Sequence, residues 1–321
     1  MSDMKKKMNK FKELYKDKYE ALEEALDVIS SKDSVDLSDY EKLTHEFNSL
    51  LRQTVKLVKR SDSIQRKLRE TREVLREKND RILSDLEKAA EYVRSLLPEK
   101  IDKEKISTDW KFEPSFRLGG DAFGYNKIDE ENLAVYLLDV TGHGIGSALH
   151  SISALNVIKY QNLQNIDFKK PEEVLKGLNK GFQMSEHGEK FFTLWYGVFN
   201  RKSSVMKYSS AGHPPAMLAH DGNIKMLEND NFVIGGLPEF DFVSSEIEIP
   251  AGSNLFVYSD GVYEVNVSEN EIWDIDNLKN YYKDKIEKNS FNLDDLYRYV
   301  LDLEGAESLE DDFSAMVINF K

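Results

Sequence analysis

The stretch Asn-Leu-Ala-Val-Tyr-Leu-Leu-Asp-Val, residues 132–140, is almost continuously apolar, and Thr-Gly-His-Gly-Ile-Gly, residues 141–146, follows it directly. A run of this kind predicts a strand that is buried on both faces. The alternating glycines predict a turn whose backbone can approach another group closely, and the amides of a following helix could receive an anion. Taken alone, the stretch is equally compatible with a plain strand-to-helix turn.

Short β-rich runs and helical patterns alternate around this strand. Further strands are predicted at residues 191–199, 205–208, 216–219, 224–227, 255–258 and 313–320. Asp221-Gly222 separates two of these runs and is a hairpin signal. Helices are predicted after Gly146, from Pro171 and over residues 293–303. Because the strands come in hairpin-like groups, the pattern favours an α+β fold, in which antiparallel sheet is covered by helices.

Acidic residues stand at the ends of several predicted strands. They are Asp121, Asp139, Asp260, Asp311 and Asp312. Any one of them could be a turn residue, which is how we interpret Asp221. If the strands share a core, however, these carboxylates project from one rim of a sheet, where they would repel one another and lose hydration. Mg²⁺ and Mn²⁺ prefer such oxygen ligands, so the joint pattern predicts a divalent metal site.

Residues 1–97 differ in composition, since they contain no glycine and no proline. A heptad seam is predicted at Leu43, Phe47, Leu50, Thr54, Leu57, Ser61, Ile64, Leu68, Thr71, Leu75, Lys78 and Ile82. A shorter apolar stripe over residues 8–29 precedes this seam. The long helices could pair in a parallel homodimer, or the short helix could fold back within one chain. We favour the dimer because a long seam needs a long partner, although a solvated spacer is also possible.

Charge and composition narrow the possible functions. The 321 residues carry a formal net charge of -14, so a nucleic acid partner is not expected. Cysteine is absent, which excludes disulfides and thiol catalysis. The N-terminus lacks the apolar stretch of a signal peptide, and no run approaches the length of a membrane span. We therefore expect a cytoplasmic protein without a membrane partner.

Five motifs, in order, resemble the SpoIIE/RsbU-like bacterial branch of the metal-dependent (PPM, type 2C) serine/threonine phosphatases. They are Gly119-Gly120-Asp121, Asp139-Val140-Thr141-Gly142-His143-Gly144, Ala211-Gly212-His213-Pro214-Pro215, Tyr258-Ser259-Asp260-Gly261-Val262 and Asp311-Asp312-Phe313-Ser314. The resemblance covers about residues 90–321. It implies an α-β-β-α sandwich phosphatase domain at residues 98–321, preceded by an all-α coiled-coil module for regulation or dimerisation at residues 1–97.

The resemblance also implies a site for two Mn²⁺ or Mg²⁺ ions. Asp139 would bridge both ions and the Val140 carbonyl would ligate one, while Asp260 and Asp311 would complete the other. Asp121 would act near the second ion, directly or through water, and Asp312 would belong to the metal set in a supporting role. At two positions this sequence departs from the eukaryotic members of the wider family. Thr141 stands where the eukaryotic enzymes have a histidine, so His143 is interpreted as structural, and Arg117 is only the nearest candidate for their phosphate-binding arginine.

The implied reaction is hydrolysis of a phosphoserine or phosphothreonine protein by metal-activated water. By resemblance, the substrate would be a STAS-domain anti-anti-sigma factor or a similar regulator, and an activating protein could act on the N-terminal helices. A catalytically inactive relative serving as a signalling scaffold is the main alternative. A nucleotide cyclase and a purely structural coiled-coil protein are weaker alternatives, since no Walker-type loop is present and the acidic pattern would be unexplained.

Overall fold

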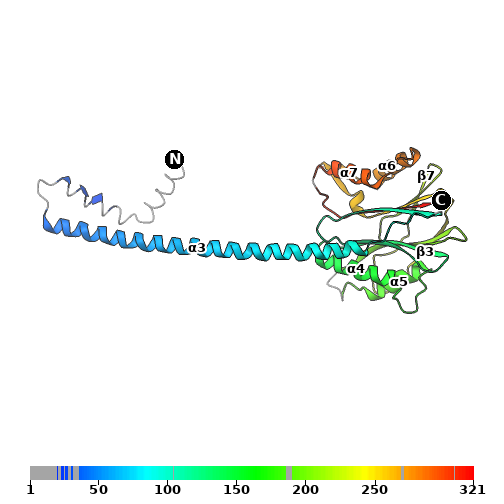
Figure 1. The fold of residues 1–321 in the computed structure, drawn as a ribbon, viewed down its shortest axis with the longest axis horizontal. Helices are drawn as coiled ribbons and strands as arrows, with labels where there is room; N and C mark the ends of the chain where they lie inside the picture. Colours follow the sequence, from blue (N-terminus) through cyan, green and yellow to red (C-terminus); the bar gives the residue numbers. More distant parts are fainter. Residues whose placement is uncertain are drawn as a thin grey trace. The chain divides into compact units, whose positions relative to one another are not determined.

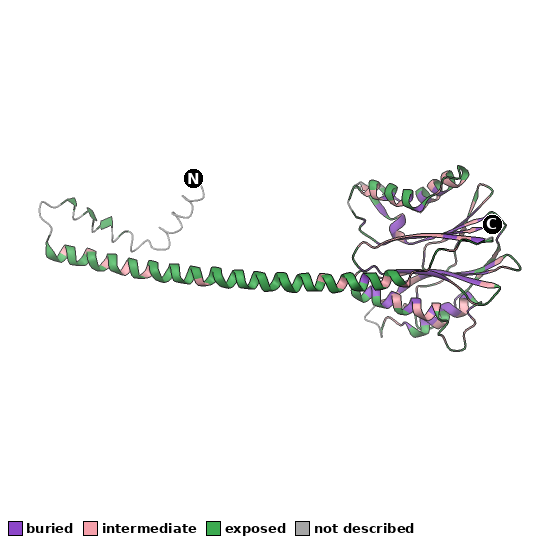
Figure 2. Cartoon of the chain, viewed as in Figure 1, coloured by how far each residue is buried: buried purple, intermediate pink, exposed green. Residues whose placement is uncertain are grey.

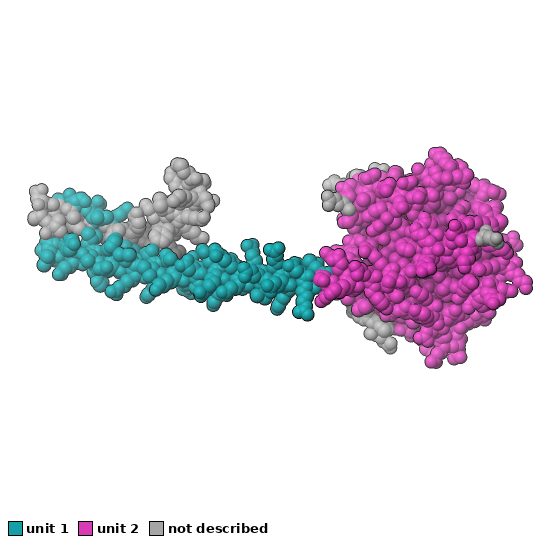
Figure 3. All heavy atoms as spheres, viewed as in Figure 1, with its two compact units in different colours: residues 1–83 teal, residues 84–321 magenta. Residues whose placement is uncertain are grey.

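The computed structural model describes residues 36–103, 105–185, 190–268, 271–306 and 308–321, together with a few positions between residues 20 and 31. Most of the short helix predicted over residues 8–29 lies outside the described residues. The chain divides into two compact units, residues 1–83 and 84–321 (Figure 3). The second unit begins at residue 84 and includes the end of the long helix. The domain boundary predicted from the sequence, between residues 97 and 98, stays a prediction.

Helix α3 (Leu37–Leu96) carries the predicted seam and ends just before Pro98, where the sequence predicts a break (Figure 1). Its surface is mostly exposed along residues 37–83 (Figure 2). Six apolar seam residues are more than 40% exposed, namely Phe47, Leu57, Ile64, Leu68, Leu75 and Ile82. Burial of such side chains is a main source of helix stability. The seam is therefore an apolar face that the described part of a single chain leaves uncovered.

The C-terminal unit is built on two five-stranded antiparallel sheets. The first has the order β1 (Ile106–Glu113), β12 (Phe313–Phe320), β9 (Asn254–Tyr258), β6 (Ala216–His220) and β7 (Asn223–Leu227). The second has the order β2 (Asp121–Lys127), β3 (Asn132–Val140), β4 (Phe192–Asn200), β5 (Val205–Ala211) and β8 (Ser245–Glu248). A separate hairpin is formed by β10 (Val265–Ser268) and β11 (Glu271–Trp273).

Helices cover the outer face of each sheet. Helices α4 (Ile145–Lys159) and α5 (Pro171–Gly181) share a core with the second sheet. Helices α6 (Ile275–Glu287) and α7 (Leu293–Glu304) share a core with the first sheet. A third core joins the facing sides of the two sheets. The four layers in Figure 1 are therefore an α-β-β-α sandwich, which confirms the fold class predicted from the sequence.

Strand β3 shows why its sequence is apolar at almost every position. Ala134, Tyr136 and Leu138 belong to the core under α4 and α5. Val135 and Leu137 belong to the core between the sheets. Successive side chains of a strand point to opposite faces, so a strand covered on both faces must be apolar throughout. Near its end, the half-buried Asp139 interrupts this apolar pattern, one residue before the buried Val140.

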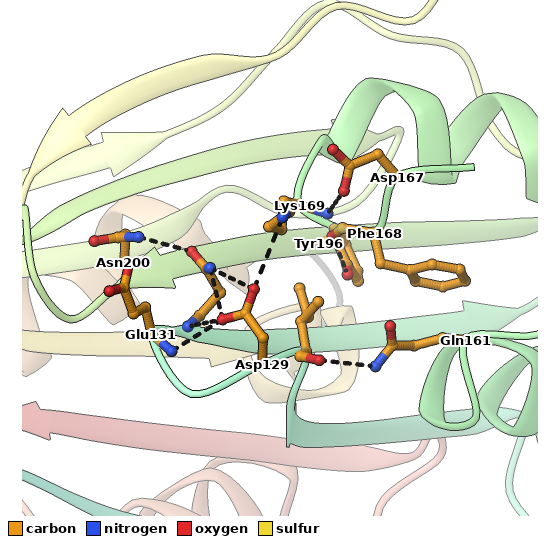
Figure 4. Close-up of polar contacts among 10 residues, drawn as sticks. Asp129, Glu131, Gln161, Asp167, Phe168, Lys169, Tyr196 and Asn200 are labelled. Carbon is orange, nitrogen blue, oxygen red and sulfur yellow. Dashed lines mark hydrogen bonds and ion pairs between the residues drawn. The ribbon is translucent and has the colours of Figure 1, made fainter. Parts of the chain in front are cut away.

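Polar contacts hold α4 and α5 against the second sheet (Figure 4). In the turn between β2 and β3, Asp129 Oδ1 accepts a hydrogen bond from the Asn132 amide at 2.8 Å. The Lys169 ammonium lies 3.8 Å from the same carboxylate. On β4, the Tyr196 hydroxyl donates to the Phe168 carbonyl at 2.8 Å. These bonds fix the loop between α4 and α5, and thereby the two helices that cover β3.

The last turns of α3 belong to the C-terminal unit. Ala90 is buried there with Leu118 and Ala148, and Leu86 and Val93 pack against this small cluster. Lys159 at the end of α4 donates a hydrogen bond to the Leu96 carbonyl at 3.3 Å, which satisfies one of the last carbonyl groups of α3. Within the described residues, no helix is both long and apolar enough to cross a membrane.

Candidate metal centre

The first pair of predicted acids comes from the second sheet. Asp121 is the first residue of β2 and Asp139 is the last but one of β3. The two strands are antiparallel neighbours, and their register places Asp121 directly opposite Asp139. Directly opposed residues have Cβ atoms about 5 Å apart. Strand pairing therefore brings together two carboxylates that are 18 positions apart in the sequence.

The second pair comes from the first sheet. Asp260 follows β9 and opens the short 3-10 helix η1 (Asp260–Val262), while Asp311 lies two residues before β12. Strands β9 and β12 are antiparallel neighbours, so these ends meet at one edge. The expectation that the acids project from the rim of a single sheet is therefore wrong. They form two pairs from two facing sheets, which we call the acidic edge: Asp121, Asp139, Asp260 and Asp311.

Charge repulsion and burial act together on the first pair. Asp121 is only 2% exposed, and burial, followed by the charges of Asp139 and Asp312, raises its pKa well above the usual value. Burial, followed by the charges of Asp260 and Asp311, raises the pKa of Asp139 to about 7. Both shifts report carboxylates that are costly to ionise where they stand. The dependence of Asp139 on Asp260 and Asp311 shows that the two pairs interact.

The second pair is shifted in the same direction. Burial and then the charge of Asp311 raise the pKa of Asp260 to about 6, although the Gly261 amide donates to its carboxylate at 2.9 Å. Burial also raises the pKa of Asp311, and the nearby His143 opposes that change. All four members of the acidic edge therefore favour a compensating positive charge. Clusters of such shifted groups are typical of functional sites.

The donor chemistry fits a hard divalent cation. Asp121 Oδ2 is buried and has no hydrogen-bond partner, although buried polar atoms rarely lack one. The Val140 carbonyl lies beside Gly120, since a Cβ atom built on that glycine would stand 2.7 Å from the carbonyl oxygen. Carboxylate and carbonyl oxygens are the ligands that Mg²⁺ and Mn²⁺ prefer. Within the described residues, no three histidine, cysteine or acidic side chains are already gathered closely enough to hold a metal ion.

Asp312 stands apart from the acidic edge because backbone amides already occupy its carboxylate. Oδ1 accepts from the Ser115 amide at 2.8 Å and from its hydroxyl at 3.0 Å, and Oδ2 accepts from the Gly120 amide at 2.6 Å. Only 5% of Asp312 is exposed. These bonds hold the turn that leads into Asp121. They favour the supporting role expected for Asp312 over direct ligation of a metal.

Two basic candidates from the sequence lie outside this carboxylate set. The His143 ring stacks on Phe116 with ring centroids 5.2 Å apart, and both residues are exposed. The Arg117 guanidinium pairs with Glu87 of α3 at 3.2 Å. Arg117 therefore contacts the end of the long helix, whereas His143 stacks on Phe116 and also lies near enough to Asp311 to oppose the rise of its pKa.

Behind the site lie His213, which belongs to one of the five motifs, and two residues that the sequence did not single out, Thr193 and Lys190. Thr193 is the register partner of Asp139, and its hydroxyl lies 2.7 Å from Nδ1 of the buried His213. Burial lowers the pKa of His213 to about 3, so this imidazole is neutral. Lys190 reaches the Thr141 carbonyl across 49 positions of sequence. No local pattern marks Thr193 or Lys190, because strand pairing alone brings them to Asp139 and Thr141.

Known proteins are similar to this chain in sequence and in fold. Residues 129–321 match the family model described as Stage II sporulation protein E (SpoIIE). Phosphoserine phosphatase RsbP of Bacillus subtilis (strain 168) is 31% identical over 189 residues, which are 57% of this chain and 46% of RsbP. Phosphoserine phosphatase RsbU of the same organism is 27% identical over 255 residues, covering 78% of this chain and 74% of RsbU. The chain thus spans less than half the length of RsbP.

A solved structure shows the same architecture. The SiaA-PP2C domain of Pseudomonas aeruginosa superposes with a TM-score of 0.63 at 15% sequence identity. The match covers 76% of this chain and 98% of the SiaA domain. At this identity the likeness concerns the fold, which is that of PP2C-type phosphatase domains. The family match spans most of the C-terminal unit, including Asp139, Asp260 and Asp311. The chain therefore belongs to the SpoIIE family and carries a phosphatase domain of the PP2C type.

Proposed function

We propose that this chain is a metal-dependent phosphatase that hydrolyses phosphoserine or phosphothreonine in a regulatory protein. The observation that carries the proposal is the acidic edge, where carboxylates from two sheets meet and where burial and mutual repulsion raise their pKa values. A structure that only needed stability would not retain such repulsion. The relatives named phosphoserine phosphatases support phosphoserine as one substrate class.

Asp139 is the central residue of the proposed mechanism. It lies opposite Asp121 and feels the charges of Asp260 and Asp311, so it faces both pairs. We infer that it contacts both of two Mn²⁺ or Mg²⁺ ions. Asp260 and Asp311 would complete one ion site, while the Val140 carbonyl and Asp121 would serve the other. When bound, the ions would supply acidified water and positive charge for the phosphoryl oxygens.

The side chains of the protein then need only to hold the metal ligands in place and orient them. Asp312 fixes the turn before Asp121 through the Ser115 and Gly120 amides, so Asp121 is placed by backbone rather than by a mobile side chain. Thr193, the register partner of Asp139, is held by the buried, neutral His213. No side chain is required to form a covalent bond to phosphorus. This agrees with a chain that contains no cysteine.

The natural substrate in this proposal is a phosphorylated STAS-domain anti-anti-sigma factor or a similar regulator. Regulation would use α3, whose exposed seam we propose to be covered by a second copy of the chain. An activating protein bound to the N-terminal helices could change this pairing. Because the end of α3 packs on Leu118 and Ala148, a change there would reach the unit that carries the acidic edge.

Hydrolysis of para-nitrophenyl phosphate and of a phosphoserine peptide tests the proposed activity. We expect turnover that requires Mn²⁺ or Mg²⁺, and that Asp139→Ala abolishes while circular dichroism stays native. Turnover that is independent of metal, or that survives in Asp139→Ala, would contradict the proposal. A chain that binds a phosphoprotein tightly but hydrolyses neither substrate under any metal condition would instead be a signalling scaffold.

A further inference from the structure

Lys190 makes two short contacts with the glycine-rich loop that follows Asp139. It lies just before β4, and its Nζ donates to the Thr141 carbonyl at 3.1 Å and to Ser147 Oγ at 2.9 Å. The Ser147 hydroxyl donates to the same carbonyl at 3.1 Å. Ser147 is fully buried in the first turn of α4. The ammonium therefore joins the start of the loop, the start of α4 and the approach to β4.

The loop has little intrinsic rigidity. Gly142 and Gly144 adopt positive φ angles of 79° and 87°, a region that glycine reaches without steric cost but also leaves easily. Gly144 is the N-cap of α4 and has no side-chain capping bond. Fixing such backbone in one conformation costs conformational entropy. The Val140 carbonyl belongs to the last residue of β3, directly before this loop, so a restraint on the loop helps to hold that carbonyl ready.

Thr141 is fixed from both sides. Its amide and its hydroxyl donate to the Phe191 carbonyl, each at 3.0 Å, which anchors the residue to the chain entering β4. Lys190 holds its carbonyl from the other direction. The preceding carbonyl, that of Val140, is left beside Gly120, next to Asp121. Anchoring Thr141 at both its amide and its carbonyl therefore fixes the peptide unit that bears the Val140 oxygen.

We propose that Lys190 is a positioning residue that pre-orders the Val140 carbonyl for a divalent cation. This inference rests on the proposed metal-dependent function. Lys190 would act through Thr141 and Ser147, without touching the cation or the substrate. Groups that orient metal ligands in this way typically change metal affinity by about 10–100-fold when they are removed.

A merely structural lysine would behave differently. Its loss would lower thermal stability and leave metal affinity unchanged. Lys176 provides a matched control, because its ammonium also makes a polar contact, with Asp241 at 3.1 Å, but on an exposed part of α5. Lys176→Met removes the same charge and the same kind of side chain as Lys190→Met. The pair separates the effect of position from the effect of net charge.

The test is a Mn²⁺ titration of the full chain, with free Mn²⁺ measured by electron paramagnetic resonance. We expect Lys190→Met to raise the dissociation constant of the tighter site about tenfold. Lys190→Arg should stay within about threefold of the native value, because a guanidinium can donate to both acceptors. Lys176→Met should not differ from the native protein. Melting curves of the metal-free variants show whether each remains folded.

The outcomes separate this inference from the proposed function. Native-like Mn²⁺ affinity in folded Lys190→Met would overturn the positioning role alone. A native chain that binds no Mn²⁺ would overturn the proposed metal-dependent function and this role with it. If Lys190→Met does not fold, Ser147→Ala removes the second acceptor with a smaller change. About threefold weaker Mn²⁺ binding would then support the role, and unchanged binding would overturn it.

Discussion

The acidic edge and the seam of α3 both contain groups that the described chain leaves unsatisfied, but they differ in kind. At the acidic edge, Asp121 is 2% exposed and has a carboxylate oxygen without a partner. Along the seam, Leu68 is 67% exposed and Leu75 is 62% exposed. Buried negative charge is stabilised by a bound cation, whereas exposed apolar surface is stabilised by packing against another apolar surface. The two regions thus predict two different kinds of partner.

The largest effect should come from breaking the acidic edge. Asp260→Asn keeps the size of the side chain and removes its charge, so we expect metal-dependent turnover of para-nitrophenyl phosphate to fall about a thousandfold or more. Asp221→Asn is the matched control, because Asp221 also precedes a glycine but lies in the β6–β7 hairpin turn. Its activity should stay within about twofold of native. Equal losses in both variants would contradict the assignment.

Charged substitutions in the seam should weaken dimerisation, which sedimentation measures. We expect native protein to sediment as a dimer, and Leu68→Glu with Leu75→Glu to raise the dimer dissociation constant about a hundredfold, because buried apolar contacts are replaced by like charges. Lys67→Glu, on the neighbouring position of the helix, is the control for added negative charge. A native chain that sediments as a monomer at all concentrations would remove the dimer from the account.

Asp312 tests whether satisfied and unsatisfied carboxylates behave differently. Asp312→Ala leaves the Ser115 and Gly120 amides without acceptors, so we expect a loss of about 2 kcal/mol in the free energy of unfolding. Urea denaturation of the metal-free protein measures this loss. Asp311→Ala, which removes a member of the acidic edge, should be neutral or stabilising under the same conditions. The reverse order would mean that Asp312 is the unsatisfied group.

The last prediction concerns pH, and its sign is firmer than its size. The pKa of Asp139 is about 7 in the folded protein and close to 3.8 in the unfolded chain. A raised folded pKa contributes stability that is present below the unfolded value and lost as pH rises through the folded value. At pH 8, above both pKa values, the shift of about 3 units corresponds to about 4 kcal/mol, so metal-free Asp139→Asn should be more stable than native protein by up to that amount. The difference should disappear by about pH 4, and a native protein that is more stable at pH 8 would contradict the sign.

Local patterns in the sequence predicted much of the fold. The apolar run at β3, the Asp221-Gly222 turn and the heptad seam each depend on neighbouring residues, and the structure contains the strand, the hairpin and the helix. Strands β1, β2, β8, β10 and β11 and helix α6 were not singled out. Strand β8, for example, alternates exposed and half-buried residues at the edge of its sheet and has little apolar signal.

The candidate site was predictable in its residues but not in its geometry. The acids stand at strand ends, which the sequence displays, whereas their division between two sheets follows from strand order. Pairing of β2 with β3 sets Asp121 against Asp139, and pairing of β9 with β12 brings Asp260 near Asp311. The contact of Lys190 with Thr141 spans 49 positions, and no periodic pattern predicts such a contact.

The most direct test of the account is an anomalous difference map from crystals of the full chain grown with Mn²⁺. We predict two peaks at the acidic edge, both beside Asp139, with one also contacting Asp260 and Asp311 and the other near the Val140 carbonyl. A map with no peak at the acidic edge, at Mn²⁺ concentrations that support turnover, would contradict the claim that these two pairs of carboxylates form the metal centre.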